Sequence, residues 1–434
     1  MTGLAPGAAA LAFLLAAVAP LALALAAGEE PGGWHEEAGI AAGLVGLALL
    51  LLQFAHAGRW EAVSGRVGID VTMRFHRAAA ILLLALVLLH PVLFVAPLLA
   101  RDPLAGLARL HAMFGSPRMT TGKLAWIALI VTVALALARR RMRYQVWRLL
   151  HGLGAAAAAG LAVWHALSVG LYSGFPILAL MWLAGLAGAG LLLGWSWGWK
   201  PWRLGGGRWR LGAVAPLGSG YWEVTLDGPA PHHRAGQFFW LAFGRTAPWD
   251  DNPFSVASAP GEKRLRFVIR EAGDMTRRLG SLGAGLPVRV DGPYGAFVVP
   301  DGDGPLLLVA GGAGIAPILS IARDLAARGD PRPVALLHGA RSADRLVCRA
   351  EVAAIAARHG WRVLHLAEEG EIPPPVETGL MQRDRLAALI SGWNPAEVTA
   401  MICGPEPMTM AVVRHLEALG VPPGGLRYEL FDYA

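Results

Sequence analysis

Two long apolar stretches of the chain each carry a pair of histidines, and the spacing within the two pairs is the same. The pairs are His76 with His90 and His151 with His165, and 90 − 76 and 165 − 151 both equal 14. At about 100° per residue, 14 residues turn a helix through ~1400°, within roughly 40° of whole turns, so both histidines of a pair share one helix face. The rise of ~21 Å would place one histidine toward each side of a hydrocarbon core about 30 Å thick.

An ionisable side chain inside a membrane helix is costly unless it finds a partner in the bundle. Neutral imidazole is a common axial ligand of haem iron. The repeated spacing therefore predicts that two facing helices hold two haems, stacked across the bilayer, through these four histidines. The alternative is four unrelated histidines that form hydrogen bonds between helices or lie at the membrane interfaces, and the repeat disfavours it.

The rest of the sequence divides into a membrane half and a soluble half. The chain is 55% hydrophobic and only 16% charged, and most of its long apolar runs come before about residue 200. This composition is too apolar for an ordinary soluble protein of 434 residues. Six spans are predicted, at residues 4–27, 38–57, 74–97, 122–138, 147–170 and 176–196. The first run lacks a basic start and is long enough to span, so we expect an uncleaved helix rather than a signal peptide.

The arginines beside these spans predict the orientation of the chain. They cluster after the second, fourth and sixth spans, whereas the connection between the first two spans holds four glutamates and no Lys or Arg. The positive-inside rule then places both termini and the soluble half in the cytoplasm and residues 98–121 outside. We expect an integral protein of a bacterial inner membrane, with His76 facing His151 near the cytoplasm and His90 facing His165 near the outer surface. The net charge of +7 reflects these arginines, and with no basic stripe of interleaved aromatics the sequence does not indicate nucleic-acid binding.

The soluble half changes its pattern once, near residue 300. From about residue 208, short alternating segments separated by Pro and Gly turns predict a small antiparallel β-barrel. After Pro305, buried apolar strands alternate with helical stretches, which predicts a doubly wound α/β layer. The predicted domains are therefore a helical membrane domain at 1–200, a barrel at 201–300 and an α/β nucleotide-binding domain at 301–434. Only two cysteines occur, so no disulfide framework is expected.

Two groups of barrel residues are candidates for binding a flavin. In the first, a hydroxyl follows an aromatic ring, and the two could contact a flavin edge and cover its ring; a turn that leads into a strand explains the same residues equally well. This group is Asn252, Pro253, Phe254 and Ser255. The second group is Arg270, Gly273 and Thr276, in which a strand-end Arg, a glycine and a hydroxyl at a helix start would form a pyrophosphate cradle.

The α/β layer contains candidates for binding a nicotinamide coenzyme. A glycine turn follows the first buried strand and opens a helix, which would let backbone amides approach a pyrophosphate; its residues are Gly311, Gly312, Gly314 and Pro317. The second strand ends in Arg341 and Ser342 without an acidic residue, which favours the 2′-phosphate of NADPH over the free ribose of NADH, although both could be ordinary surface residues.

The fourth strand of this layer is followed by Cys403, Gly404 and Pro405, at the position where a nicotinamide would lie. Cys403 is accordingly a candidate catalytic residue beside the nicotinamide. A small buried core residue is an equally weighted interpretation of Cys403.

Together, these motifs resemble the ferric reductase and NADPH oxidase superfamily over nearly the full chain. The resemblance implies two bis-histidine haems, expected to be of the b type, FAD on the barrel and NAD(P)H on the α/β layer. It also implies a C-terminal aromatic ring stacked on the flavin, which either Phe431 or Tyr433 would supply, and Phe431 is taken as the catalytic candidate. Asn252 departs from the family pattern, which usually has His or Arg there.

The predicted function is transmembrane electron transfer from NADPH, with NADH as the other candidate donor. A nicotinamide delivers two electrons as hydride, whereas a haem accepts one at a time, and a flavin converts between the two. With both axial positions filled, the outer haem would reduce its acceptor without binding it, which fits dioxygen or a ferric chelate. Two other interpretations remain open: an electron-supplying subunit that reduces a periplasmic redox protein, and a haem-free transporter with a regulatory flavodomain.

Overall fold

The computed structural model describes residues 6–27, 32–56, 68–205, 207–229, 232–244, 246–247 and 250–430. The chain forms two compact units, Met1–Pro201 and Trp202–Ala434. The first unit is helical, and the second contains two β-sheets with their covering helices.

The first unit contains six helices that are long and apolar enough to cross a membrane, as predicted. They are α1 (Pro6–Ala26), α2 (Trp34–Leu52), α4 (Ile69–Leu93), α7 (Thr120–Leu137), α8 (Tyr144–Val169) and α9 (Pro176–Gly194). Both α2 and α4 begin earlier than the apolar runs that were used to predict them. The helical hydrogen bonds continue through flanking polar residues, which hydropathy alone assigns to a connection.

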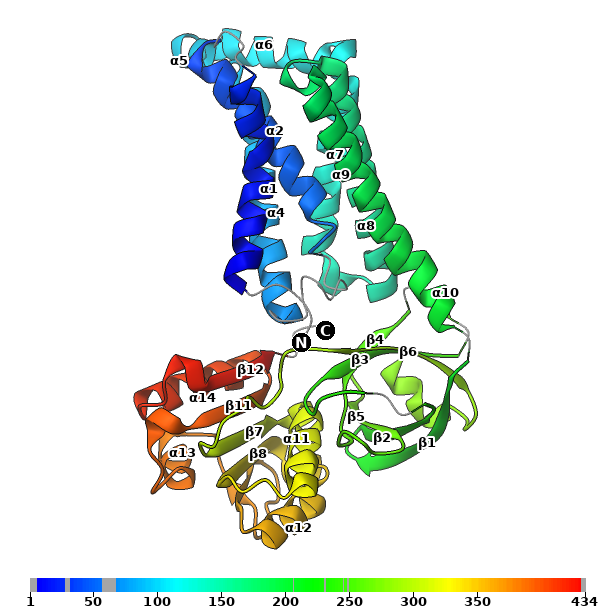
Figure 1. Cartoon of the computed structure of the whole chain (residues 1–434), viewed down its shortest axis with the longest axis vertical. Coiled ribbons are helices and arrows are strands. Elements are labelled where there is room, and N and C mark those ends of the chain that lie inside the picture. Colours follow the sequence, from blue (N-terminus) through cyan, green and yellow to red (C-terminus); the bar gives the residue numbers. More distant parts are fainter. Residues whose placement is uncertain are drawn as a thin grey trace. The chain divides into compact units, whose positions relative to one another are not determined.

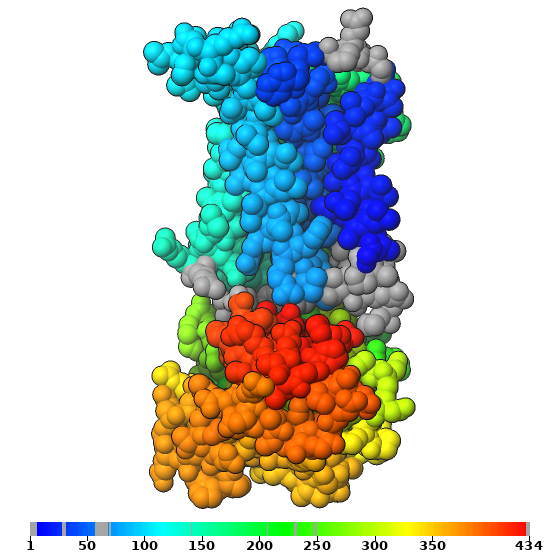
Figure 2. Space-filling view, turned by 90° about the vertical axis from the view of Figure 1, so that its left-hand side faces the viewer, coloured from blue at the N-terminus to red at the C-terminus, as the bar shows by residue number. Residues whose placement is uncertain are grey.

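The connection between α4 and α7, predicted as a loop, is largely helical. It forms α5 (Ala96–Arg101) and α6 (Pro103–Gly115), which lie across one end of the helical bundle (Figures 1 and 2). The start of α6 has a clear local cause: the side chain of Asp102 accepts a hydrogen bond of 3.0 Å from the amide of Ala105, and Pro103 occupies the first helical position. Leu104 and Leu107 of α6 are strongly exposed, at 80% and 56%.

Small residues allow the membrane helices to pack closely. Ala158 and Ala159 of α8 are fully buried, and they share a core cluster with Leu49 of α2, Leu83 of α4 and Leu129 of α7. The Ala-rich run of α8 therefore forms the centre of the bundle, between the two positions where its histidines project.

The barrel of the second unit is a six-stranded antiparallel sheet in the order β4-β3-β6-β1-β2-β5. Its strands are β1 (Trp209–Gly218), β2 (Tyr221–Asp227), β3 (Phe238–Phe243), β4 (Asn252–Ser255), β5 (Leu265–Arg270) and β6 (Pro287–Tyr294). A bridge between Val256 and Phe267 connects the two outer strands, β4 and β5, so the sheet curls into the predicted barrel around Phe239 and Leu241.

The second sheet is parallel throughout, with the order β10-β9-β8-β7-β11-β12. Its strands are β7 (Leu306–Gly311), β8 (Val334–Ser342), β9 (Arg362–Glu369), β10 (Glu377–Thr378), β11 (Thr399–Gly404) and β12 (Leu426–Leu430). Helices α11 (Ile315–Arg328) and α12 (Arg349–His359) cover one face, and α13 (Arg383–Leu389) and α14 (Glu406–Ala418) cover the other. This arrangement is the predicted doubly wound layer, in which ligands bind at the carboxyl ends of the strands.

Candidate functional site

The histidine pair predicted to lie near the outer surface, called the outer pair below, lines one cavity; the other pair is called the inner pair. His90 on α4 and His165 on α8 both border a mostly apolar space of about 360 Å³ within the helical unit. That volume lies within the roughly 300–1,000 Å³ of typical ligand pockets. The structure thus brings together two histidines that are 75 residues apart in the sequence (165 − 90).

The environment of His90 fixes which ring nitrogen is available for a metal. Its Nδ1 lies 2.8 Å from the backbone oxygen of Gly39 on α2. Because a carbonyl oxygen only accepts, Nδ1 must donate its proton, and Nε2 keeps its lone pair. This is the tautomer of a histidine that ligates through Nε2 while its other nitrogen is held by the protein.

Two glycines allow the outer histidines to approach the neighbouring helices. A Cβ added at Gly43 of α2 would lie 2.8 Å from both Cε1 and Nδ1 of His90. A Cβ at Gly122 of α7 would lie 2.8 Å from the same two atoms of His165. Each imidazole therefore rests directly on the backbone of a neighbouring helix, where only glycine leaves enough space.

The polar groups of this cavity fit a large ligand that carries carboxylates. Lys123 of α7 is the one Lys, Arg, Asp or Glu among the residues that line it, all of which are described. In the described structure, Trp126 Nε1 and His165 Nδ1 are buried without a hydrogen-bond partner. A haem would supply partners for these groups. Its iron binds imidazole, and its propionates could pair with the Lys123 ammonium and accept from the Trp126 N–H. The residues of this cavity therefore fit the predicted haem.

The inner pair has a comparable environment. His76 lies on α4 and His151 on α8, the same two helices that carry the outer pair. The Nδ1 of His151 donates to the backbone oxygen of Thr132 on α7 at 3.3 Å, and the ring of Trp147 stacks on the imidazole with centroids 5.4 Å apart. His76 Nδ1 is buried and unpartnered within the described residues. In the described part of the chain no group of three or more metal-binding side chains is present, so pairs are the largest candidate ligand sets.

The first predicted flavin group is split between the two faces of a strand. Asn252 to Ser255 form β4 and pair with β3, with Ser255 opposite Phe238. Successive side chains of a strand point to opposite faces. Phe254 is partly buried and packs against the barrel core, and Ser255 is only 6% exposed. Asn252 is half-buried and its Nδ2 lies 3.5 Å from the backbone oxygen of Asp250.

The second flavin group forms a compact turn after β5. The hydroxyl of Thr276 accepts hydrogen bonds of 2.9 Å from the amides of Ala272 and Gly273 and donates to the Gly273 oxygen at 3.0 Å. Thr276 therefore shapes this turn. Arg270, at the end of β5, is exposed and hydrogen-bonds the hydroxyl of Tyr221, whose pKa is raised by burial.

The glycine turn after β7 requires glycine at two positions. A Cβ at Gly314 would overlap the carbonyl oxygen of Cys403, and Gly312 has a φ of +53°. Helix α11 begins at Ile315 with Pro317 buried in its first turn and, among the described residues, no side-chain cap. The free amides of such a helix start are suited to an anion.

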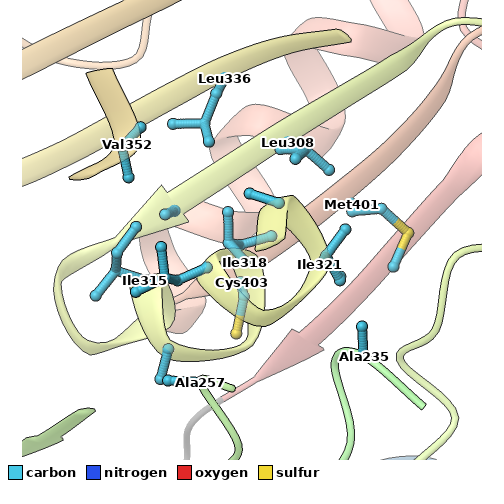
Figure 3. Close-up of a cluster of buried hydrophobic side chains, with 14 of the residues drawn as sticks. Ala235, Ala257, Leu308, Ile315, Ile318, Ile321, Leu336, Val352, Met401 and Cys403 are labelled. Carbon is cyan, nitrogen blue, oxygen red and sulfur yellow. The ribbon is translucent and has the colours of Figure 1, made fainter. Parts of the chain in front are cut away.

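The Cys403 thiol lies inside the core of the α/β layer. It is fully buried beside Ile315 and Ile318, as Figure 3 shows. Burial, and then the nearby Glu429, raise the pKa of this thiol well above its usual range. The structure therefore agrees with the interpretation of Cys403 as a small buried residue, and any part it plays is that of a neutral thiol. Gly404 is buried and Pro405 is exposed next to it at the strand end.

Arg341 and Ser342 end β8, as predicted, and no acidic residue ends that strand. Glu369, at the end of the neighbouring strand β9, forms a 2.6 Å ion pair with Arg341. Phe431 and Tyr433, the candidates for the ring on the flavin, lie outside the described residues.

Three family models match successive parts of the chain. Residues 42–162 match the ferric reductase like transmembrane component, residues 213–298 an FAD-binding domain and residues 308–414 the oxidoreductase NAD-binding domain. The first match contains His76, His90 and His151, and it ends three residues before His165.

Curated relatives resemble the soluble half. The electron transfer component of toluate 1,2-dioxygenase from Pseudomonas putida is 31% identical over 183 residues, 41% of this chain and 53% of that protein. The reductase component of propane 2-monooxygenase from Mycolicibacterium goodii is 33% identical over 189 residues, again 41% and 53%. The chain thus spans about half the length of these relatives. Among solved structures, the Amycolatopsis cytochrome P450 reductase GcoB is 27% identical, with a TM-score of 0.46 over 52% of this chain and 69% of that one.

Proposed function

Given that the chain has the architecture of the ferric reductase and NADPH oxidase superfamily, we propose that it is an NAD(P)H-dependent oxidoreductase that transfers electrons across a membrane. In this proposal the electrons leave NAD(P)H on the α/β layer, pass the FAD site of the barrel and two haem sites in the bundle, and reach an acceptor on the outer face. When bound, FAD takes a hydride as an electron pair and releases single electrons, and b-type haems accept them one at a time.

The observation that carries the proposal is the outer cavity. It brings His90 and His165 together, presents the free Nε2 of His90 and leaves both imidazoles in contact with glycine backbone. A chance pair of buried histidines would not be expected to combine a preset tautomer with a large apolar space enclosed by several helices. We assign His90 and His165 to the outer haem and His76 and His151 to the inner haem.

The remaining residues bind and orient the other participants. The amides of Gly312 and Gly314 at the start of α11 would bind the coenzyme pyrophosphate, with Gly311 and Pro317 shaping the turn. Gly404 and Pro405 border the place of the nicotinamide, and either Phe431 or Tyr433 would lie on the flavin. Arg270 would pair with the FAD pyrophosphate, beside the turn that Gly273 and Thr276 form.

If His90 and His165 both bound the outer haem, its iron would have no open position, and the acceptor would be reduced at the outer face without binding the metal. Dioxygen and a ferric chelate both fit such outer-sphere reduction. The positive-inside rule supports an orientation with the flavin- and coenzyme-binding unit in the cytoplasm and α5 and α6 at the outer surface of a bacterial inner membrane. A periplasmic redox protein is the alternative acceptor.

The test is an anaerobic optical spectrum of the full-length chain loaded with haem and FAD, before and after addition of NAD(P)H. We expect the sharp bands of reduced low-spin haem to appear, and His90→Ala and His165→Ala each to remove one haem per chain while flavin reduction persists. His111→Ala is the matched control, since His111 is exposed on α6 and outside both pairs. Unchanged haem content in both variants would refute the ligand assignment. Admitting air or a ferric chelate then identifies the acceptor, and slow reoxidation by both would favour a protein partner.

A further inference from the structure

We propose that the chain selects NADH over NADPH and that Glu369 is the residue responsible. The proposal rests on the proposed function, because it concerns the coenzyme of the same site. It reverses the preference that the sequence suggested, which depended on the absence of an acidic side chain where β8 ends.

The two strands that end at this place are β8 and β9. They pair in parallel with Ser342 opposite Glu369, so the last residues of both strands lie at one edge of the sheet. In a doubly wound layer this edge receives the coenzyme, and an acidic side chain there accepts a hydrogen bond from a free ribose hydroxyl, whereas an Arg receives the 2′-phosphate of NADP. The arrangement at this edge therefore bears directly on coenzyme choice.

Both side chains that were predicted to receive the 2′-phosphate are bound to carboxylates. Arg341 Nε lies 2.6 Å from Glu369 Oε1. The Ser342 hydroxyl hydrogen-bonds Asp344, which also accepts from Ser219 in the hairpin between β1 and β2. These hydroxyls, Ser219 first, hold the pKa of Asp344 below its usual range, so its carboxylate is charged at neutral pH.

The charge at this edge does not favour a phosphate. The two guanidinium groups, Arg341 and Arg345, are matched by two carboxylates, Glu369 and Asp344, which gives 2 − 2 = 0. A 2′-phosphate would add about −1.5 to −2 charges at neutral pH, with no uncompensated cation to receive them. A ribose hydroxyl adds no charge and donates to a carboxylate, so the same groups favour NADH.

The exposure of the Arg341–Glu369 pair does not weaken this inference. Their side chains are 68% and 57% exposed, so the pair itself stabilises the fold very little. A coenzyme can reach both groups, as a binding site requires. If Arg341 turned toward a 2′-phosphate, it would leave Glu369 unpaired beside that phosphate, and the repulsion would remain.

The experiment compares the binding of ADP-ribose and its 2′-phosphate to the full-length chain by isothermal titration calorimetry. We expect the wild-type chain to bind ADP-ribose more tightly. Glu369→Gln keeps the shape of the side chain and removes its charge, and it should shift the affinity ratio about tenfold toward the 2′-phosphate. Glu368→Gln, an identical charge change at the exposed neighbouring position, is the matched control and should shift it much less.

The double variant Arg341→Ala/Glu369→Gln locates the effect. If the neutral side chain of the Glu369→Gln variant frees Arg341 to bind the 2′-phosphate, the double variant should lose the increase in affinity for the 2′-phosphate that this single substitution produces. A wild-type preference for the 2′-phosphate, or equal shifts in the Glu368 and Glu369 variants, would overturn the proposal. Because the probes carry no hydride, a chain that bound them as expected but failed to reduce haem would refute the proposed function and leave this inference standing.

Discussion

Replacement of Gly43 by Ala tests most directly whether the outer histidines are held for a metal. The added Cβ would stand 2.8 Å from Cε1 and Nδ1 of His90, whereas ordinary contact begins at 3.4 Å. The imidazole must then move by about 0.6 Å (3.4 − 2.8) away from α2 or tilt. Either motion disturbs the 2.8 Å hydrogen bond from Nδ1 to the Gly39 oxygen, because that bond leaves the same edge of the ring.

The magnitude follows from the tolerance of a metal–ligand bond. Metal sites hold their ligand distances to about ±0.2 Å, so a shift of this size is well outside the range. The loss of a partner that orients a ligating histidine typically costs about 10–100-fold in metal affinity. We therefore expect outer-haem binding to weaken by a factor of this order, equivalent to about 1.4–2.8 kcal/mol. Gly122→Ala should also displace His165, since the added Cβ would lie 2.8 Å from its Cε1 and Nδ1, but this imidazole has no Nδ1 hydrogen bond to lose in the described structure, so the effect should come from the displacement alone.

The assay is the haem content per chain by pyridine haemochrome, followed by a redox titration of the Soret band. In both variants the number of haems per chain should fall from two toward one as the concentration of free haem is lowered. The redox transition of the inner haem should be preserved. Gly160→Ala is the matched control, because Gly160 lies on α8 between the two histidines and has no atom within 4 Å of an added Cβ. Two fully retained haems with unchanged potentials in the Gly43 and Gly122 variants would refute the reasoning.

Three further outcomes are expected. Lys123→Met removes the only Lys, Arg, Asp or Glu that lines the outer cavity. The outer haem should then bind more weakly by about 1.5–3 kcal/mol, and its midpoint potential in a redox titration should fall. Lys123→Arg keeps the charge and should leave the affinity and the potential unchanged. Gly314→Ala places a methyl group against the backbone of Cys403, so the coenzyme-binding layer should lose about 1–3 kcal/mol in thermal unfolding, with Gly424→Ala as an unhindered control. Burial, joined by charge repulsion, lowers the pKa of His338 to about 3 and of His365 to about 4. As the pH falls below about 6.5, these histidines therefore take up protons in the unfolded chain before they do so in the folded chain. Each histidine should then lower the free energy of unfolding by about 1.4 kcal/mol per pH unit, down to about pH 4. Replacement of both by Leu should flatten this pH dependence in thermal melts between about pH 5 and 7.5.

Features that depend on local pattern could be predicted from the sequence. Hydropathy located six spans, a spacing of 14 placed each histidine pair on one helix, and strand periodicity separated an antiparallel from a parallel sheet. The three family models confirm the resemblance to ferric reductases and NADPH oxidases and the oxidoreductase class. Helices α5 and α6 were missed, because short helices that lie across a bundle have no continuous apolar run.

Features that depend on contacts between distant residues could not be predicted. Glu369 meets Arg341 only because β9 pairs with β8 in one particular register. Gly43 and Gly122 look like ordinary membrane-helix glycines until the neighbouring histidines are placed against them. The strand pairing that places Ser255 opposite Phe238 likewise depends on contacts between distant residues.

Helices α4 and α8 carry the four histidines that we propose as haem ligands, and the neighbouring helices α2 and α7 carry the glycines on which His90 and His165 rest. Helix α2 packs against α4 and holds His90 through Gly39 and Gly43, and α7 packs against α8 and contacts His151 and His165 through Thr132 and Gly122. Each pair of helices therefore orients its own imidazoles before any ligand is present. A ligand held between His90 and His165 would join the two pairs and would bind the folded bundle but not the unfolded chain, so it must stabilise the bundle by mass action. Since neighbouring backbone already contacts these imidazoles, less of the binding free energy would be lost in ordering them, and the bundle would be preorganised for the proposed haem.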